Sequence, residues 1–216
     1  MYSKLYYKKH QDGSYASAYK ILKYLTTFIT IESIIDFGCG VGTWCSAAQN
    51  LSINNIMGVD QNLYDSSYML IPNKNYLQRD LQKSVSLDMK MDLVISVEVG
   101  EHIESRYSHV FINTLCQHGD IILFSAALPY QGGTGHINEK PCSYWRDIFS
   151  DLDYIAIDCI RGVFWEDDDV EVWYKNNTIL YVRDGLQFDI LNKISSSYPI
   201  DIIHPDMLQR ILLKRS

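Results

Sequence analysis

The stretch IIDFGCGVGTW, residues 34–44, places three glycines within five residues directly after a run of apolar residues. The apolar run has the composition of a buried strand, and a helical pattern begins at Thr43. Glycine loses more backbone freedom on folding than any other residue, so we expect it where the main chain turns tightly or closely approaches another group. The stretch therefore predicts a strand, a tight turn and a helix, with the turn lying against a ligand.

Strand-like and helix-like patterns alternate along the rest of the chain. Strands are predicted over residues 33–37, 55–60, 75–80, 91–98, 120–127, 154–161 and 176–185. Helices are predicted over residues 14–28, with Ser14 as the N-cap, and over residues 43–51, 104–117 and 142–152. This alternation is typical of an α/β fold with a Rossmann-like, doubly wound sheet, and it argues against a sandwich.

The chain has 216 residues, which is enough for one α/β domain with a full core and short for two. We expect an N-terminal helical segment over residues 1–30, a core over 31–184 and a C-terminal tail over 185–216. No apolar run approaches the roughly 20 residues that span a bilayer, and the N-terminus lacks the apolar core of a signal peptide. We therefore expect a cytoplasmic protein without a membrane partner.

Charge and cysteine content exclude further classes of protein. The formal net charge is −7, so the chain lacks the basic field with which nucleic-acid binders neutralise phosphates. Its five cysteines are an odd number without a CxxC pair, which predicts buried, reduced thiols rather than disulfides or a thiolate zinc site. The composition leaves the oligomeric state open.

Three aspartates stand at the ends of successive predicted strands: Asp36, Asp60 and Asp80. Ligands of an open parallel sheet bind beyond the carboxyl ends of the strands. A carboxylate after the second strand suits a ribose, because its oxygens can accept hydrogen bonds from two vicinal hydroxyls. Thr43 stands where the dinucleotide fingerprint needs its third glycine, and the missing Walker lysine excludes a P-loop.

Four motifs in this order, IIDFGCGVGTW, GVDQN, LQRDL and DLVISVEVGEHI, resemble the successive motifs of class I S-adenosylmethionine-dependent methyltransferases. The resemblance covers residues 33–127 and implies a seven-stranded sheet whose last strand is antiparallel. It implies that the glycine turn contacts the methionine moiety, that Asp60 holds the ribose, that Asp80 with Leu81 meets the adenine, and that the N-terminal segment forms a lid. The implied cofactor-binding residues are Asp36, Gly38, Cys39, Gly40, Asp60, Gln61, Asp80, Leu81 and Glu98.

The residues that handle the acceptor are expected on the loops after the fourth and fifth strands. Methyl transfer from a sulfonium is an in-line displacement, so the enzyme must aim the acceptor and, for a hydroxyl, remove its proton. The first loop carries an E-x-x-E-H motif, Glu98, Glu101 and His102, and the second carries His136. Two carboxylates and two imidazoles can bind Mg²⁺, Mn²⁺, Fe²⁺ or Zn²⁺. The motif is similar to the metal-binding motif of small-RNA 2′-O-methyltransferases and ubiquinone-pathway O-methyltransferases.

A role without a metal is the alternative, because the same motif occurs in class I methyltransferases that bind none. Glu101, His102 and His136 are then the candidate catalytic residues, as a general base or as hydrogen-bonding groups. An unperturbed histidine titrates near pH ~6.5, which suits proton removal at neutral pH.

The loop PYQGGTGHINE, residues 129–139, is the second informative stretch. Its glycines allow close approach to a ligand, and loops on a rigid sheet carry much of the specificity in such folds. We predict that the acceptor is contacted by Tyr130, Gln131, His136 and Asn138. The alternative is a structural turn whose polar groups bind one another.

The later segments FSAALPYQGGTGHINEKPCSYW, DCIRGVFW and WYKNNTILYV resemble a bacterial subgroup of methyltransferases that we associate with small-molecule and glycan modification. The leading hypothesis is an S-adenosylmethionine-dependent methyltransferase that acts on a hydroxyl, in preference to an amine, of a small molecule or sugar. Two alternatives are a metal-dependent RNA ribose 2′-O-methyltransferase and a non-catalytic subunit that binds the cofactor.

Overall fold

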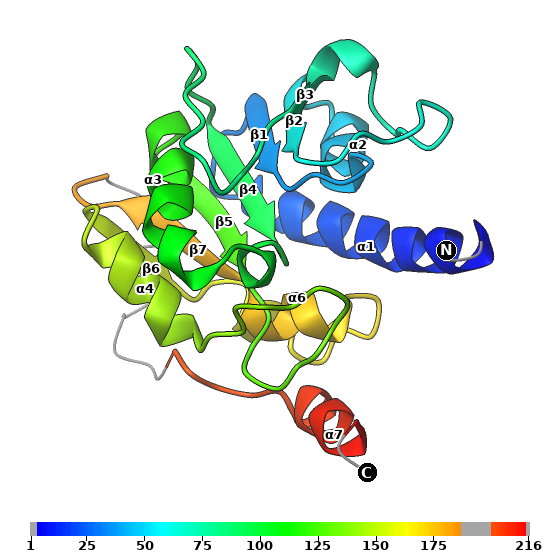
Figure 1. The fold of residues 1–216 in the computed structure, drawn as a ribbon, viewed down its shortest axis with the longest axis vertical. Coiled ribbons are helices and arrows are strands. Elements are labelled where there is room, and N and C mark those ends of the chain that lie inside the picture. Colours follow the sequence, from blue (N-terminus) through cyan, green and yellow to red (C-terminus); the bar gives the residue numbers. More distant parts are fainter. Residues whose placement is uncertain (1–3, 187–199, 215–216) are drawn as a thin grey trace.

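Seven strands form one sheet in the order β3-β2-β1-β4-β5-β7-β6 in the computed structural model (Figure 1). The structure describes residues 4–186 and 200–214, with side chains from residue 12 onward. The strands are β1 (Ser33–Phe37), β2 (Asn55–Asp60), β3 (Tyr76–Gln78), β4 (Leu93–Val97), β5 (Ile121–Ser125), β6 (Tyr154–Ile157) and β7 (Ile179–Arg183). Strands β1 to β5 pair in parallel, whereas β7 is antiparallel to both β5 and β6. This arrangement confirms the doubly wound α/β sheet with an antiparallel last strand.

Helices cover both faces of the sheet, with α1 and α2 on one side and α3 and α4 on the other (Figure 1). The helices are α1 (Lys4–Leu25), α2 (Thr43–Asn50), α3 (Ser108–His118), α4 (Cys142–Ser150), α5 (Arg161–Phe164), α6 (Val172–Asn177) and α7 (Pro205–Leu213). Short 3₁₀ turns are η1 (Asn73–Asn75), η2 (Gly100–His102) and η3 (Ser105–Tyr107).

Three strands are shorter than the sequence predicted. The strand expected over residues 154–161 ends at Ile157, and α5 begins at Arg161. The strand expected from residue 176 begins at Ile179, because residues 176 and 177 belong to α6. The strand expected over residues 75–80 ends at Gln78, so Asp80 follows it by two residues.

Helix boundaries also differ from the sequence-based expectations. Helix α1 begins at Lys4, so Ser14 lies inside the helix instead of capping it, and its hydroxyl is 3.1 Å from that of Tyr174. The helix expected from residue 104 begins at Ser108, after a 3₁₀ turn. Helices α5 and α6 were not predicted, because four and six residues are too short to display a helical period.

The central strands are buried on both faces, which explains their continuous apolar sequence. Every residue of β1, β4 and β5 is buried. Successive side chains point to opposite faces of a strand, so Ile34 packs with α1 and α2 while Ile35 packs with α3 and α4. All five cysteines are buried and free, as their number and spacing predicted.

The order of the strands opens a crevice beside β1. Strand β1 pairs with β2 on one side and with β4 on the other. The connections that follow β1 and β4 therefore lead to helices on opposite faces of the sheet, α2 and α3. In open α/β sheets, ligands bind at such a switch point, beyond the carboxyl ends of the strands. The glycine turn follows β1 there, and the E-x-x-E-H segment follows β4.

The glycine turn depends on left-handed backbone. Gly38, Gly40 and Gly42 have φ angles of 86°, 55° and 92°. The Gly38 amide donates to the carbonyl of Val59 at 2.7 Å. A Cβ atom on Gly38 would lie 2.3 Å from a methyl of Val99, so the turn packs directly against the loop after β4.

The described part of the C-terminal tail packs on the domain. The Arg161 guanidinium donates to the carbonyl of Ile200 at 2.7 Å, and the Ser143 amide donates to Asp201 at 2.8 Å. Residues 187–199 of the tail, the first three residues and the last two lie outside the described residues. None of the described helices is long and apolar enough to cross a membrane.

The packing at Gly38 predicts that Gly38→Ala lowers the free energy of unfolding by about 2–5 kcal/mol. The left-handed φ costs a residue with a Cβ atom ~1–2 kcal/mol, and the contact with Val99 adds a penalty for overpacking of ~1–3 kcal/mol. Urea denaturation measures the change. The control is Gly162→Ala in α5, where a Cβ atom meets nothing within 4 Å, so alanine should leave stability equal or slightly higher. Equal losses in the two variants would contradict the prediction.

Candidate active site

Asp60 connects the glycine turn to the loop after β2. Its side chain is 6% exposed, and Oδ2 accepts a hydrogen bond from the Gly40 amide at 2.9 Å. Oδ1 accepts the Asn62 amide at 2.8 Å and the Asn62 side-chain amide at 3.1 Å. A carboxylate oxygen accepts about two hydrogen bonds, so Oδ2 keeps one acceptor direction for a ligand hydroxyl.

Gly40 differs from Gly38 in what surrounds it. A Cβ atom built on Gly40 would meet no protein atom within 4 Å, although φ at Gly40 is also left-handed. Close packing explains why position 38 has to be glycine, but it does not explain position 40. The open side of Gly40 lies next to Asp60, which supports the prediction that a ligand approaches the main chain there.

Asp36 is an unusual carboxyl group in the middle of the sheet. It is 2% exposed, and its Oδ2 atom has no hydrogen-bond partner among the described residues. Burial, and then the charge of Asp60, raises its pKa from 3.8 to about 8. A buried carboxyl that lacks a partner costs free energy unless a donor or a positive charge reaches it. The assignment of Asp36 as a cofactor-binding residue stays a prediction.

The other predicted cofactor residues lie in different surroundings. Gln61 and Asp80 are exposed, whereas Leu81 and Cys39 are 3% and 7% exposed. Hydrogen bonds from the Gln82 amide and the Lys83 ammonium lower the pKa of Asp80. Burial raises the pKa of the Cys39 thiol, which is therefore inert as a nucleophile.

Glu98 is held by protein donors on both of its oxygens. Oε1 accepts hydrogen bonds from Ser125 at 2.9 Å and Asn177 at 3.0 Å, and Oε2 accepts one from Gln131 at 3.0 Å. Burial raises the pKa of Glu98, and these three hydrogen bonds oppose the shift. Its φ angle of 54° is left-handed, which is uncommon for a residue with a side chain. Glu98 does not belong to the group of potential metal ligands that the structure brings together, which differs from its predicted role as a metal ligand.

Three of the four predicted metal ligands do come together: Glu101, His102 and His136. Their potential ligand atoms all lie within 4.8 Å of one another. Glu101 is 1% exposed, and burial followed by the nearby charge of Glu98 raises its pKa well above the usual range. Burial also lowers the pKa of His102. Burial therefore disfavours the ionised carboxylate of Glu101 and the protonated imidazolium of His102.

Both imidazoles are oriented by acceptors on the same ring atom. His136 Nδ1 lies 2.9 Å from the Glu139 carboxylate, and His102 Nδ1 lies 3.1 Å from the Gly135 carbonyl. A carbonyl accepts and does not donate, and an ionised carboxylate behaves likewise, so each Nδ1 atom carries a hydrogen. In the neutral form, each Nε2 atom then has a free lone pair. His136 Nε2 is 3.8 Å from Glu101 Oε1, and the two imidazole rings meet edge to face with centroids 5.0 Å apart.

Two of the predicted acceptor contacts are bound to protein groups instead. Gln131 is 6% exposed, and its side-chain oxygen accepts from the Leu128 amide at 3.1 Å and from Asn177 at 3.0 Å. Asn138 is 2% exposed and donates to the Ser108 hydroxyl at 3.1 Å. These bonds support a positioning role for both residues. Tyr130 is 66% exposed, and His136 lies in the cluster with Glu101, so their predicted contacts with an acceptor stay predictions.

Sequence reasoning missed the partners of Glu98. Asn177 ends α6, a helix that was not predicted, and Ser125 ends β5. The sequence does hold one indication of the role of Asn177: two asparagines stand directly before an apolar strand. Because a buried amide without a partner is costly, such residues are expected to bind another polar group.

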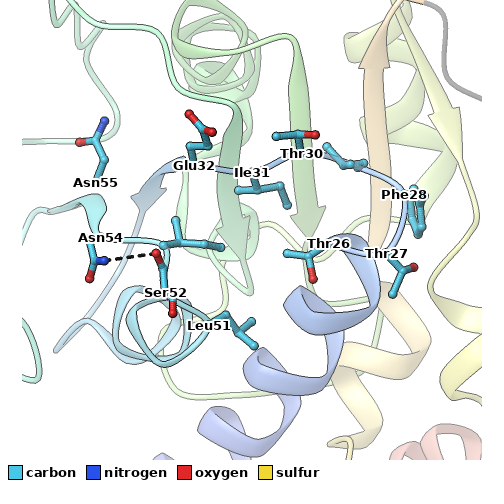
Figure 2. A pocket seen from close by; sticks show the side chains of 12 residues that line it. Thr26, Thr27, Phe28, Thr30, Ile31, Glu32, Leu51, Ser52, Asn54 and Asn55 are labelled. Carbon is cyan, nitrogen blue, oxygen red and sulfur yellow. Dashed lines mark hydrogen bonds between the residues drawn. The ribbon is translucent and has the colours of Figure 1, made fainter.

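A surface pocket lies at the amino ends of β1 and β2, on the side of the sheet away from the candidate site (Figure 2). Its walls are residues 26–32, which lead into β1, and residues 51–55, which lead into β2. These are the amino ends of the two strands. The pocket is therefore separate from the crevice that holds Asp36, Asp60 and the histidines.

Comparisons with known proteins agree with this geometry. A methyltransferase-domain family matches residues 7–166 of the chain. None of the curated proteins matches the sequence significantly. Three solved structures are similar at 13–17% identity, which shows the fold alone.

DesVI of Streptomyces venezuelae is similar at a TM-score of 0.59 and 13% identity, over 83% of this chain and 95% of that one. Magnesium protoporphyrin IX methyltransferase of Synechocystis PCC 6803, with bound S-adenosylhomocysteine, is similar at 0.54 and 17%, over 85% and 89%. The methyltransferase domain of bacterial CtHen1-C is similar at 0.55 and 16%, over 81% and 98%.

The position of Asp60 predicts that Asp60→Ala weakens the binding of S-adenosylmethionine by roughly 10- to 100-fold. The variant loses the charged acceptor offered to the ribose, where such a hydrogen bond contributes ~1.5–3 kcal/mol, and frees the Gly40 amide. Isothermal titration calorimetry measures the affinity. Asp65→Ala is the control, because this exposed aspartate accepts from Ser67 in the same loop without contacting the glycine turn. Unchanged affinity in Asp60→Ala would disprove the ribose assignment.

The raised pKa of Asp36 predicts that the ligand-free protein loses stability as the pH rises. Between the unfolded value of 3.8 and the folded value of about 8, the folded state holds a proton that the unfolded state has released. The stabilisation is complete below pH ~4 and is lost as the pH rises through about 8. Asp36→Asn cannot lose this proton, so its melting temperature should rise relative to the wild type between pH ~5 and pH ~8.5. The exposed Asp88→Asn serves as control, and parallel curves for wild type and Asp36→Asn would refute the prediction.

Proposed function

The chain belongs to the methyltransferase-domain family, and from this premise we propose that it methylates a hydroxyl oxygen of a small molecule or a sugar. One observation carries the choice of a hydroxyl. A cluster of the buried Glu101 with the partly exposed His102 and His136 lies on the loops after β4 and β5, beside the glycine turn. A hydroxyl needs a base that removes its proton, whereas a free amine is already a nucleophile.

The proposed cofactor position follows the crevice at the carboxyl ends of the strands. The methionine part of S-adenosylmethionine lies against the open side of Gly40, with the buried carboxyl of Asp36 nearby. The remaining acceptor direction of Asp60 Oδ2 binds a ribose hydroxyl, and Asp80 lies exposed farther along the same edge. Because Val99 packs on Gly38, the sulfonium end of the cofactor is directed toward the loop that carries Glu101.

The proposed reaction is a single displacement. The acceptor oxygen forms a bond to the methyl carbon while the carbon–sulfur bond breaks, and its electron pair stays on sulfur, giving S-adenosylhomocysteine. The hydroxyl proton moves to a protein base. We assign this role to His136, whose Nε2 lone pair faces Glu101. His102 is the weaker candidate, because burial lowers its pKa.

The same cluster fits a divalent metal as an alternative use. Glu101 has a buried oxygen without a hydrogen-bond partner among the described residues, and both imidazoles present Nε2 lone pairs. Glu101, His102 and His136 would hold the ion. Bound there, a divalent ion would hold vicinal hydroxyls and lower the pKa of the reacting one. Glu98 is not assigned as a fourth ligand, because its oxygens do not belong to the group of ligand atoms within 4.8 Å of one another.

An RNA ribose is the second candidate acceptor. The metal-compatible cluster favours it, and a solved small RNA methyltransferase, HEN1, is similar at a TM-score of 0.55 and 18% identity, over 79% of this chain and 25% of that one. The net charge of −7 opposes it, because RNA binding relies on neutralising phosphates. The small-molecule reading is therefore the better supported. The third alternative is a subunit that binds the cofactor without catalysis. It is less well supported than an enzyme, because Glu101, His102 and His136 offer possible bases beside the proposed cofactor site.

The test is methyl transfer from labelled S-adenosylmethionine to three sets of acceptors: catechols and other vicinal diols, sugars, and short RNA. His136→Ala should lower kcat by roughly 10²- to 10⁴-fold, the usual contribution of a general base. Its affinity for the cofactor should stay within about twofold of the wild type, because His136 is not placed against the cofactor-binding residues. His109→Ala on the exposed side of α3 is the control.

Chelation separates the two uses of the cluster. Loss of activity in a chelator, restored by one divalent metal, would assign the cluster to a metal, and unchanged activity would assign it to the base. Methylation of RNA but not of diols or sugars would overturn the proposed acceptor class. An active His136→Ala variant would remove the proposed base.

A further inference from the structure

We propose that Glu139 is a positioning residue that fixes the ring orientation and tautomer of His136. The inference rests on the function proposed for His136 and adds a residue that acts through it. Glu139 lies at the end of the loop that begins at Tyr130, and its side chain is 20% exposed. Glu139 is not one of the three residues, Glu101, His102 and His136, whose potential ligand atoms lie close together. Its proposed role therefore differs from theirs.

Glu139 organises the loop through three hydrogen bonds on one carboxylate. Oε2 accepts from the Tyr130 amide at 2.8 Å, and Oε1 accepts from the Gly132 amide at 2.5 Å and from His136 Nδ1 at 2.9 Å. Among the described residues, no lysine or arginine forms an ion pair with it. Its negative charge is therefore directed at two main-chain amides and one imidazole.

The loop needs such an acceptor because its backbone is irregular. Tyr130, Gly132 and Gly135 have φ angles of 71°, 64° and 77°, all left-handed. A segment with several left-handed residues cannot form the repeating hydrogen bonds of a helix or strand. The carboxylate of Glu139 bonds two of its amides and, in the same arrangement, the ring of His136.

The contact determines which nitrogen of His136 is basic. An ionised carboxylate only accepts, so Nδ1 carries the hydrogen and Nε2 keeps its lone pair on the side of Glu101, 3.8 Å from Oε1. A carboxylate behind an imidazole orients the ring and stabilises the imidazolium that forms when Nε2 takes a proton. If the ring binds a metal instead, the same contact orients the same lone pair.

The loop is also held at points that do not involve Glu139. The Lys214 ammonium donates to the carbonyls of Gln131 and Gly132 at 2.7 and 2.9 Å. At the other end, the amides of Ile137 and Asn138 donate to the carbonyl of Glu101 at 2.9 and 3.0 Å. Loss of the Glu139 carboxylate should therefore leave the loop attached and change mainly the imidazole.

The experiment compares Glu139→Ala, Glu139→Gln and wild type by ¹⁵N–¹H correlation of the histidine rings, recorded at about pH 9, where an imidazole is neutral. The His136 signals are assigned by their loss in His136→Gln. Wild type should carry the ring hydrogen on Nδ1. Glu139→Ala should populate the Nε2–H form, and Glu139→Gln should keep Nδ1–H, because its amide oxygen still accepts. Glu104→Gln is the control, since it removes a nearby charge that pairs with Arg106 and not with His136.

Kinetics supply the second measurement. Glu139→Ala should lower kcat by roughly 10- to 100-fold, the usual loss when a partner behind a histidine is removed, with KM for S-adenosylmethionine unchanged within about twofold. Glu139→Gln should recover most of the loss. If Glu139 had a purely structural role, Glu139→Ala would change the melting temperature and KM together. The recovery of kcat in Glu139→Gln would then not depend on which nitrogen of His136 carries the hydrogen.

Two results would overturn the proposal: a wild-type His136 that carries its hydrogen on Nε2, or a Glu139→Ala variant whose tautomer is unchanged. If Glu139→Ala does not fold, the wild-type spectrum still tests the proposal, because a ring hydrogen on Nε2 would contradict the contact of Nδ1 with Glu139. A tautomer change in a protein that methylates no acceptor supports the role of Glu139 and instead overturns the proposed function.

Discussion

Left-handed backbone at Gly38 brings the turn after β1 against the loop after β4, and both halves of the site depend on this contact. Val99 occupies the place where a side chain at position 38 would lie. On one side, the turn continues to Gly40, whose amide binds the Asp60 carboxylate. On the other side, the loop continues to Glu101 in the histidine cluster. A single steric condition thus holds the proposed cofactor-binding residues next to the proposed catalytic residues.

The electrostatics of the crevice follow from burial. Asp36, Glu98 and Glu101 are shielded from water, which raises the pKa of each carboxyl group. Only Glu98 has protein hydrogen bonds on both oxygens, whereas Asp36 and Glu101 each keep a buried oxygen without a partner among the described residues. A positively charged ligand would relieve the cost of these groups, and a sulfonium nucleotide is such a ligand.

The sequence predicted what depends on local pattern and missed what depends on tertiary contacts. The buried strands β1, β4 and β5 were found because each is a largely apolar run, and Asp60 was found because it ends β2. Asp60 lies where the motif implied, beside Gly40. The periodicity of the chain does not show that Gln131 and Asn138 turn inward, because their partners, such as Asn177 and Ser108, are far away in the chain. The same reason explains why Glu98 was placed among metal ligands, since only the folded structure shows the three donors around it.

The place of β7 in the sheet has a consequence for the order of assembly during synthesis. Strand β7 lies between β5 and β6 but follows both of them in the chain. Until Arg183 has left the ribosome, β5 has one unpaired edge and β6 has no neighbour, and unpaired edges are prone to wrong pairing. Asn177, just before β7, reaches Glu98 in the same step. The sheet and the hydrogen bonds of Glu98 therefore both stay incomplete until residues 177–183 are in place.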